Sequence, residues 1–248
     1  MSQPSSRDPH ASVSAASSAG SQTATFGGAR SPQLSGSFLL TAREHTRFER
    51  AIAGIDAINS GDPNWIWVRD RERPRELALA ELVSGWVLAL RPHASLELRL
   101  AARAHHIRRW AIPRSSFPAG TAGYLRWRTR LQHFHAEEIG ILLAGEGYPE
   151  DTILRVQALI RKLGLGHDPE VQALEDAICL TFFETQLGDL ARRTPTPKMA
   201  EIVRRTLAKM STRAVEIARS LPLGEPSLLL LDTSEPSSDR SAAQHEKT

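Results

Sequence analysis

Arginine residues are concentrated in one stretch of the chain that has no acidic residue. Between Glu97 and Glu137 the sequence contains no Asp, Glu or Lys, but it carries a series of arginines: Arg99, Arg103, Arg108, Arg109, Arg114, Arg126, Arg128 and Arg130. A guanidinium group binds a phosphate group through two parallel hydrogen bonds and stacks on aromatic rings, and Trp110, Phe117, Tyr124, Trp127 and Phe134 lie in the same stretch. We therefore expect a phosphate-bearing substrate to be bound by Arg109, Arg114, Arg126 and Arg128. The alternative is a network of salt bridges with acids on other helices, since arginine outnumbers lysine throughout the chain.

Histidines occur in pairs within and beside this stretch. His105 and His106 are adjacent, and His133 and His135 are separated by one residue. On a helix, His106 shares a face with Arg109, three residues later, and His135 shares a face with Glu138. We expect His135 and Glu138 to be the catalytic groups that move protons. The alternative for each histidine is a purely structural position.

Two carboxylates are expected to be drawn toward the interior. Glu81 precedes Leu82, and Asp176 lies between Leu174 and Ile178. A buried carboxylate needs a cation, and imidazole together with carboxylate suits zinc, manganese or iron. The hypothesis is a site for a divalent transition metal (Mn, Fe or Zn) with the ligands Glu81, His105, His106 and Asp176.

The composition excludes several classes of protein. The chain has 248 residues, is 41% hydrophobic and 24% charged, and has a net charge of +3. No apolar run reaches the roughly 18 residues needed to span a bilayer, so no membrane association is expected. The single cysteine, Cys179, excludes an internal disulfide and a cysteine-based zinc finger, and it favours a reducing, cytoplasmic location. The modest net charge favours a small phosphorylated ligand over RNA, which stays an alternative partner; the oligomeric state is left open.

The hydrophobic pattern predicts an all-α fold. Thr41 and Glu44 form a capping box that opens the first helix, which ends at Gly61. Six further helices are expected over residues 75–90, 95–110, 122–145, 149–163, 169–190 and 197–221. Residues 65–68 are expected to form a buried loop rather than a strand, because no second strand is evident to pair with them. Seven helices with short connections indicate one compact domain over residues 37–222.

Polar tails flank this domain. Residues 1–36 are rich in Ser, Ala and Gly and have no hydrophobic period, so they are expected to be disordered. Residues 223–248 are expected to be mostly disordered as well, apart from a short apolar segment over residues 228–231.

The segments LAARAHHIRRW over residues 100–110, IPR over 112–114 and YLRWR over 124–128 resemble an uncharacterised family, catalogued as domain of unknown function 4202. The likeness continues in LIRK over residues 159–162 and LEDA over 174–177, and it covers about residues 43–222. This resemblance implies no known activity.

A more distant likeness is to the HD-type metal phosphohydrolases, which are all-helical. Residues 101–107 resemble the helix that carries their His-Asp pair, residues 135–138 their second histidine helix, and Asp176 takes the place of their final aspartate. The chain departs from the pattern, because His106 stands where an Asp is expected and Glu81 lies where the first His is expected. Arg161 and Lys162 also replace a pair of histidines. The resemblance implies an HD-like fold with an altered site.

Residues 209–213, KMSTR, resemble the KMSKS loop of class I aminoacyl-tRNA synthetases. That loop works on a nucleotide-binding α/β domain with a HIGH-type motif, and this chain has neither. The segment is instead expected to lie inside the last helix, so glutamyl-tRNA synthetase activity is not expected.

Two functions follow from these observations. The first is a metal-dependent phosphohydrolase that acts on a nucleotide or another small phosphorylated molecule. The alternative is a non-catalytic helical module that binds a phosphate ligand or RNA through the same arginines. Whether the histidines and acids meet in one pocket decides between them.

Overall fold

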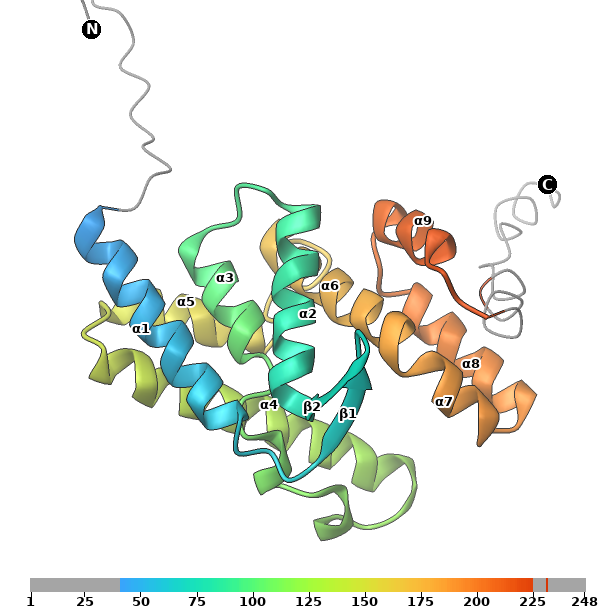
Figure 1. The fold of residues 1–248 in the computed structure, drawn as a ribbon. Coiled ribbons are helices and arrows are strands. Elements are labelled where there is room, and N and C mark those ends of the chain that lie inside the picture. Colours follow the sequence, from blue (N-terminus) through green and yellow to red (C-terminus); the bar gives the residue numbers. More distant parts are fainter. Residues whose placement is uncertain (1–40, 225–230, 232–248) are drawn as a thin grey trace, which may run out of the picture. The chain divides into compact units, whose positions relative to one another are not determined.

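The structure is a computed structural model that describes residues 41–224 and residue 231 (Figure 1). This part of the chain is mainly helical, which confirms the all-α prediction. Its helices are α1 (Ala42–Asn59), α2 (Arg75–Leu90), α3 (Leu96–Ala104), α4 (Gly120–Gly145), α5 (Glu150–Ile160), α6 (Pro169–Thr185), α7 (Leu187–Arg192), α8 (Thr196–Leu207) and α9 (Thr212–Ser220). Among the described residues, no helix has the length and apolar character that crossing a bilayer requires.

The first helix begins where the capping box predicts. The Thr41 side chain accepts a hydrogen bond from the Glu44 backbone N–H, and the Glu44 carboxylate accepts one from the Thr41 N–H at 2.9 Å. One face of α1 buries Phe48, Ala51 and Ile55. These contacts fix α1 against α3 and α4.

The core is built around α2, α3, α5 and α6. Helix α2 packs against both α3 and α6, and α5 packs against α3 and α4. Fully buried leucines from four helices meet there, including Leu98, Leu143, Leu159 and Leu180, and Leu231 belongs to the same core. The core therefore extends beyond residue 222, the predicted end of the domain.

The expected buried loop at residues 65–68 is wrong. Strand β1 (Trp65–Val68) pairs antiparallel with β2 (Arg71–Pro74), with Trp65 opposite Pro74 and Val68 opposite Arg71. The turn is closed by Arg69 and Asp70, both with positive φ. Since β2 reads Arg-Glu-Arg-Pro, it has no apolar pattern that would reveal a strand in the sequence.

Two predicted helices end earlier than expected, which places His105 and His106 in a turn and Lys162 beside α6. Helix α3 stops at Ala104, and Arg108 has left-handed backbone geometry (φ 52°), so His105 and His106 lie in a turn. Helix α5 stops at Ile160, followed by Lys162 at φ 59°. Two short 3-10 turns, Arg109–Ala111 and Arg114–Ser116, connect α3 to α4.

The predicted helices over residues 169–190 and 197–221 are each divided in two. The first breaks at Gln186, between α6 and α7. The second breaks after Leu207, because Ser211 begins α9 and its side chain accepts a hydrogen bond from the Ala214 N–H. The KMSTR segment is therefore a turn and the start of α9, not the interior of a helix. The predicted tails, residues 1–36 and most of 223–248, lie outside the described residues.

Candidate functional site

A cavity of about 720 Å³ lies among α2, α4, α6, α8 and the turn that follows α3. Basic side chains from several elements line it: Arg109, Arg114, Arg128, Lys162, Lys198, Arg205 and Lys209. Among the described residues that line the cavity, Glu175 is the acidic one. A cavity with this excess of positive charge favours an anionic occupant.

Part of the cavity wall is apolar. Helices α2 and α6 contribute Leu79, Val83, Ile178 and Phe182, and Ile202 of α8 also lines the cavity. Pockets for small organic molecules commonly combine such a wall with a few polar groups. The occupant that fits both features is an organic anion.

Arg109 is held firmly at the cavity wall. Its Nε lies 3.9 Å from Glu76 Oε1, and its Cζ lies 4.8 Å from the centre of the Trp127 ring. The Trp127 indole N–H donates to the Ile112 carbonyl at 2.9 Å, so the ring itself is fixed. The guanidinium is therefore oriented before any ligand binds.

The other predicted phosphate-binding arginines have different positions. Arg114 lines the cavity but donates to the carbonyls of Phe117 and Pro118 at 2.8 and 2.9 Å, so it also shapes its own loop. Arg128 lines the cavity beside the Tyr124 ring, with its Cζ 5.9 Å from the ring centre. Arg126 is exposed and is not among the described residues that line the cavity.

Lys162 and Lys209 were not predicted as site residues. The carboxylate of Glu175, only 2% exposed, is paired with the Lys162 ammonium and lies 3.6 Å from that of Lys209. Burial acts to raise the pKa of Glu175, but the two ammonium groups outweigh it and hold the pKa below its usual value. Since Glu175 is ionised and shared by two lysines, the cavity keeps an excess of positive charge. Its place beside Leu174 gave a signal for burial, but nothing in the sequence indicated its partners.

Three histidines form a cluster beside Arg109. The ring centres of His105 and His106 are 4.1 Å apart, and those of His106 and His135 are 5.6 Å apart. His105 Nδ1 lies 3.0 Å from the Ala102 carbonyl and His135 Nδ1 lies 2.8 Å from the Ile107 carbonyl. A carbonyl only accepts, so in both rings Nδ1 carries the hydrogen and Nε2 presents a lone pair.

Burial determines the charge of these histidines. It lowers the pKa of His105 and His106 well below the usual value, and it lowers the pKa of His135 to about 4. The nearby Arg109 guanidinium lowers the pKa of His106 and His135 further. All three imidazoles are therefore neutral at pH 7.

Glu76 is the carboxylate that faces the histidines, and sequence reasoning missed it. Its Oε2 lies 3.3 Å from His106 Nδ1, although neither atom makes an aligned hydrogen bond within the described residues. Burial raises the pKa of Glu76, and Arg109 acts in the opposite direction. The missed signal is helical spacing, because Glu76 shares a face of α2 with Leu79, Ala80 and Val83.

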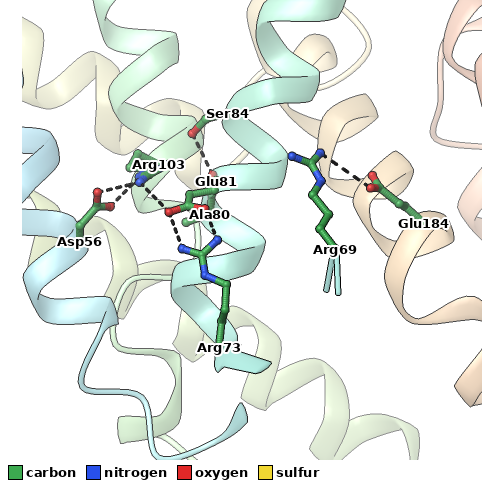
Figure 2. Close-up of polar contacts among 8 residues, drawn as sticks. All are labelled: Asp56, Arg69, Arg73, Ala80, Glu81, Ser84, Arg103 and Glu184. Atoms are coloured by element: carbon green, nitrogen blue, oxygen red, sulfur yellow. Dashed lines mark hydrogen bonds and ion pairs between the residues drawn. The ribbon is translucent and has the colours of Figure 1, made fainter. Parts of the chain in front are cut away.

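Glu81 is not near the histidines. Figure 2 shows it between two arginines: both Nη atoms of Arg73 donate to its carboxylate, and Arg103 Nη2 lies 3.5 Å away. Arg103 also holds Asp56 through two hydrogen bonds of 2.5 and 2.6 Å. These arginines lower the pKa of Glu81, which joins α1, α2 and α3 as part of an ion-pair network.

The two remaining acids also have structural partners. Asp176 is buried, as predicted, but it accepts hydrogen bonds from the Ser211 N–H at 2.9 Å and the Ser211 hydroxyl at 2.6 Å, so it fixes the start of α9. Glu138 pairs with Arg108 at 2.8 Å and is not among the residues that line the cavity. Of the predicted catalytic pair, His135 alone lies at the cluster.

The residues do not fit the predicted metal centre. The structure brings His105 and His106 together but leaves Glu81 and Asp176 in separate hydrogen-bond networks, so the four predicted ligands do not converge. Across residues 41–224 and 231, no group of three or more His, Cys, Asp or Glu side chains is arranged to hold a metal ion.

The fold and the site define an all-helical domain with a cationic cavity beside three neutral histidines. The chain matches the model of the family described as Domain of unknown function (DUF4202) over residues 49–231, and it belongs to that family. It matches no curated protein and no solved structure.

Proposed function

We propose that this protein binds a small organic phosphate in the cavity among α2, α4, α6 and α8. The observation that carries the proposal is the charge of the cavity wall, where basic side chains from four parts of the chain surround one carboxylate that two lysines already share. The phosphoryl group lies against Arg109, Arg128 and Lys162. These are the groups that charge-assisted hydrogen bonds to a phosphate require.

The size and the apolar wall favour an organic phosphate over a free inorganic ion. The volume of about 720 Å³ is within the range of roughly 300–1,000 Å³ of small-molecule sites. Ile178, Phe182 and Ile202 offer an apolar surface to the organic part of the ligand. A nucleotide, with a flat base and a phosphate end, has this combination of properties.

Hydrolysis of the bound phosphate, and the likeness to HD-type enzymes, stay predictions from the sequence. The same holds for RNA binding. We favour ligand binding as the function because three predicted phosphate-binding arginines line the cavity, whereas the predicted metal ligands are held in other networks.

The test compares two arginines that lie two residues apart on α4. Arg128 lines the cavity and Arg126 does not. With AMP as the probe in isothermal titration calorimetry, we expect Arg128→Ala to weaken binding by roughly 10- to 100-fold, the loss of one charge-assisted contact of about 1.5–3 kcal/mol. Arg126→Ala should bind within about twofold of the wild type.

Adenosine, which lacks the phosphate, is the ligand control and should bind far more weakly than AMP. Equal affinity of the two variants, or equal affinity for AMP and adenosine, would contradict the proposal. If glucose 6-phosphate binds as well as AMP, the phosphate is recognised and the base is not.

A further inference from the structure

One face of α8 borders the large cavity along most of the helix. Lys198, Ile202 and Arg205 are four and then three residues apart, so they share a face of α8, and all three line the cavity. Lys209, in the turn after α8, lines it as well. The cavity therefore has a row of cations along α8, in addition to the arginines of α4 and of the turn after α3.

This row extends well beyond the position that the proposed function gives to the phosphoryl group. The Lys209 ammonium lies 3.6 Å from the Glu175 carboxylate, which also pairs with Lys162, so Lys209 belongs to the phosphoryl end of the cavity. Lys198 lies nine residues before Leu207, the last residue of α8, which at 1.5 Å per residue is about 13 Å along the helix. Hydrogen bonds to a phosphate are about 3 Å long, so one phosphoryl group does not contact both Lys162 and Lys198.

An apolar side chain separates the cations of α8. Ile202 lies between Lys198 and Arg205 on the shared face, and Phe182 of α6 also lines the cavity. An organic group that packs on Ile202 therefore has a cation on either side of it along the helix. This order of groups matches a ligand whose organic part lies between two anionic groups.

The charge of α8 also favours a second anion. Glu201 pairs with Arg205 and accepts two hydrogen bonds from Arg204, at 2.8 and 2.9 Å, so this carboxylate is shared between two cations, as Glu175 is. Lys198 lies in the first turn of α8, where the helix dipole disfavours a positive charge. A single phosphate dianion at Lys162 leaves these positive charges of α8 in place, whereas a second phosphate would neutralise them.

We propose that the ligand is an organic bisphosphate whose second phosphate group binds Lys198 and Arg205. The first phosphate group keeps the position of the proposed function, and the organic part packs on Ile202 between the two. This inference rests on the proposed function and deepens it, because it names the class of ligand: a molecule with two phosphate groups at separate positions, such as a nucleoside 3′,5′-bisphosphate. Binding is non-covalent, and no bond to phosphorus forms or breaks.

The experiment compares AMP with adenosine 3′,5′-bisphosphate, which differs from it by one phosphate group. Isothermal titration calorimetry of the full chain is run at about 0.15 M salt, where charges more than about 8 Å apart are largely screened from each other. We expect the bisphosphate to bind the wild type about 10-fold more tightly than AMP does, because it gains charge-assisted hydrogen bonds to α8.

A matched pair of variants assigns this gain to the face of α8 that lines the cavity. Lys198→Ala should remove most of the preference for the bisphosphate and leave the affinity for AMP within about twofold of the wild type. Arg204→Ala removes the same charge from an exposed residue of α8 that is not among the residues lining the cavity, so it should keep the full preference. Lys198 is exposed and opposes the helix dipole, so its loss should not lower the stability of the fold, which urea denaturation checks.

Two results would overturn the inference. One is an affinity for the bisphosphate within about twofold of that for AMP in the wild type. The other is an equal loss of affinity for both ligands in Lys198→Ala, or equal effects of Lys198→Ala and Arg204→Ala, because general attraction by a positive surface would give that pattern.

The outcomes separate this inference from the proposed function. If AMP binds and Arg128→Ala weakens it, but the second phosphate adds nothing, the inference fails and the proposed function stands. If neither AMP nor the bisphosphate binds, both fail.

Discussion

Replacement of His135 should make the stability of the protein less dependent on pH. The side chain is 2% exposed, and burial lowers its pKa from 6.5 to about 4. Between these two pH values the unfolded state therefore binds more protons at this position than the folded state does. The contribution of this residue to the free energy of unfolding is fully present above pH 6.5 and is lost as the pH falls toward 4.

The size of the effect follows from those two pKa values. At pH 5 the unfolded imidazole is almost fully protonated and the folded one is mostly neutral, which removes about 2 kcal/mol of the free energy of unfolding relative to pH 8. In His135→Gln this contribution is absent. The loss of stability between pH 8 and pH 5 should therefore be about 2 kcal/mol smaller in the variant than in the wild type.

Urea denaturation followed by tryptophan fluorescence at both pH values measures this difference. His133→Gln is the matched control, because His133 is exposed on the same helix, and its pH dependence should equal that of the wild type. Equal pH dependence in His135→Gln and the wild type would refute the assignment of a buried, neutral imidazole.

Three further comparisons test the fold by urea denaturation. Arg103→Ala should lower the free energy of unfolding by roughly 2 kcal/mol, because Arg103 holds two carboxylates in the network of Figure 2. Arg69→Ala removes an exposed arginine that lies 3.9 Å from Glu184 and should change the free energy of unfolding by less than about 0.5 kcal/mol. Equal losses in the two variants would contradict this reasoning. Gly123→Ala should cost about 1–3 kcal/mol, since an added Cβ would lie 1.9 Å from a loop carbonyl oxygen, while the same change at Gly145 meets nothing within 4 Å and should be neutral or stabilising. Ser211→Ala removes a helix cap and a partly buried hydrogen bond to Asp176, so it should lower the free energy of unfolding by about 1–2 kcal/mol. A loss below about 0.5 kcal/mol would contradict its role in dividing α8 from α9.

The helices could be predicted where local signals mark them. Thr41 and Glu44 lie three residues apart and satisfy each other, so their capping box needs no distant partner. The turns that follow α3 and α5 could not be predicted in the same way. They contain Arg108 and Lys162, which have positive φ, and a non-glycine residue adopts positive φ only when its surroundings hold it there. For that reason the helices predicted from the sequence are longer than α3 and α5.

The candidate site was predicted in part for a similar reason. His105 and His106 follow one helix closely, so their contact with each other is local. Arg109 lies near His106 because of the turn after Ala104, and not because of the helical spacing from which the sequence placed them together. The sequence singled out Glu81, but Glu76, five residues earlier, is the carboxylate that faces the histidines. The two lie on different faces of α2, and contacts from α3 and α6 decide which face is buried. The burial of Asp176 was predicted, but its partner lies 35 residues later in the chain, beyond the reach of any local pattern.

The most direct test of a phosphate site at Arg109, Arg128 and Lys162 is a crystal structure of the full chain with AMP bound. The account predicts density for the phosphoryl group between these three side chains, with the adenine ring against Ile178 and Phe182. Density for AMP only on the outer surface, or an empty cavity at concentrations of AMP that saturate the protein in solution, would contradict it.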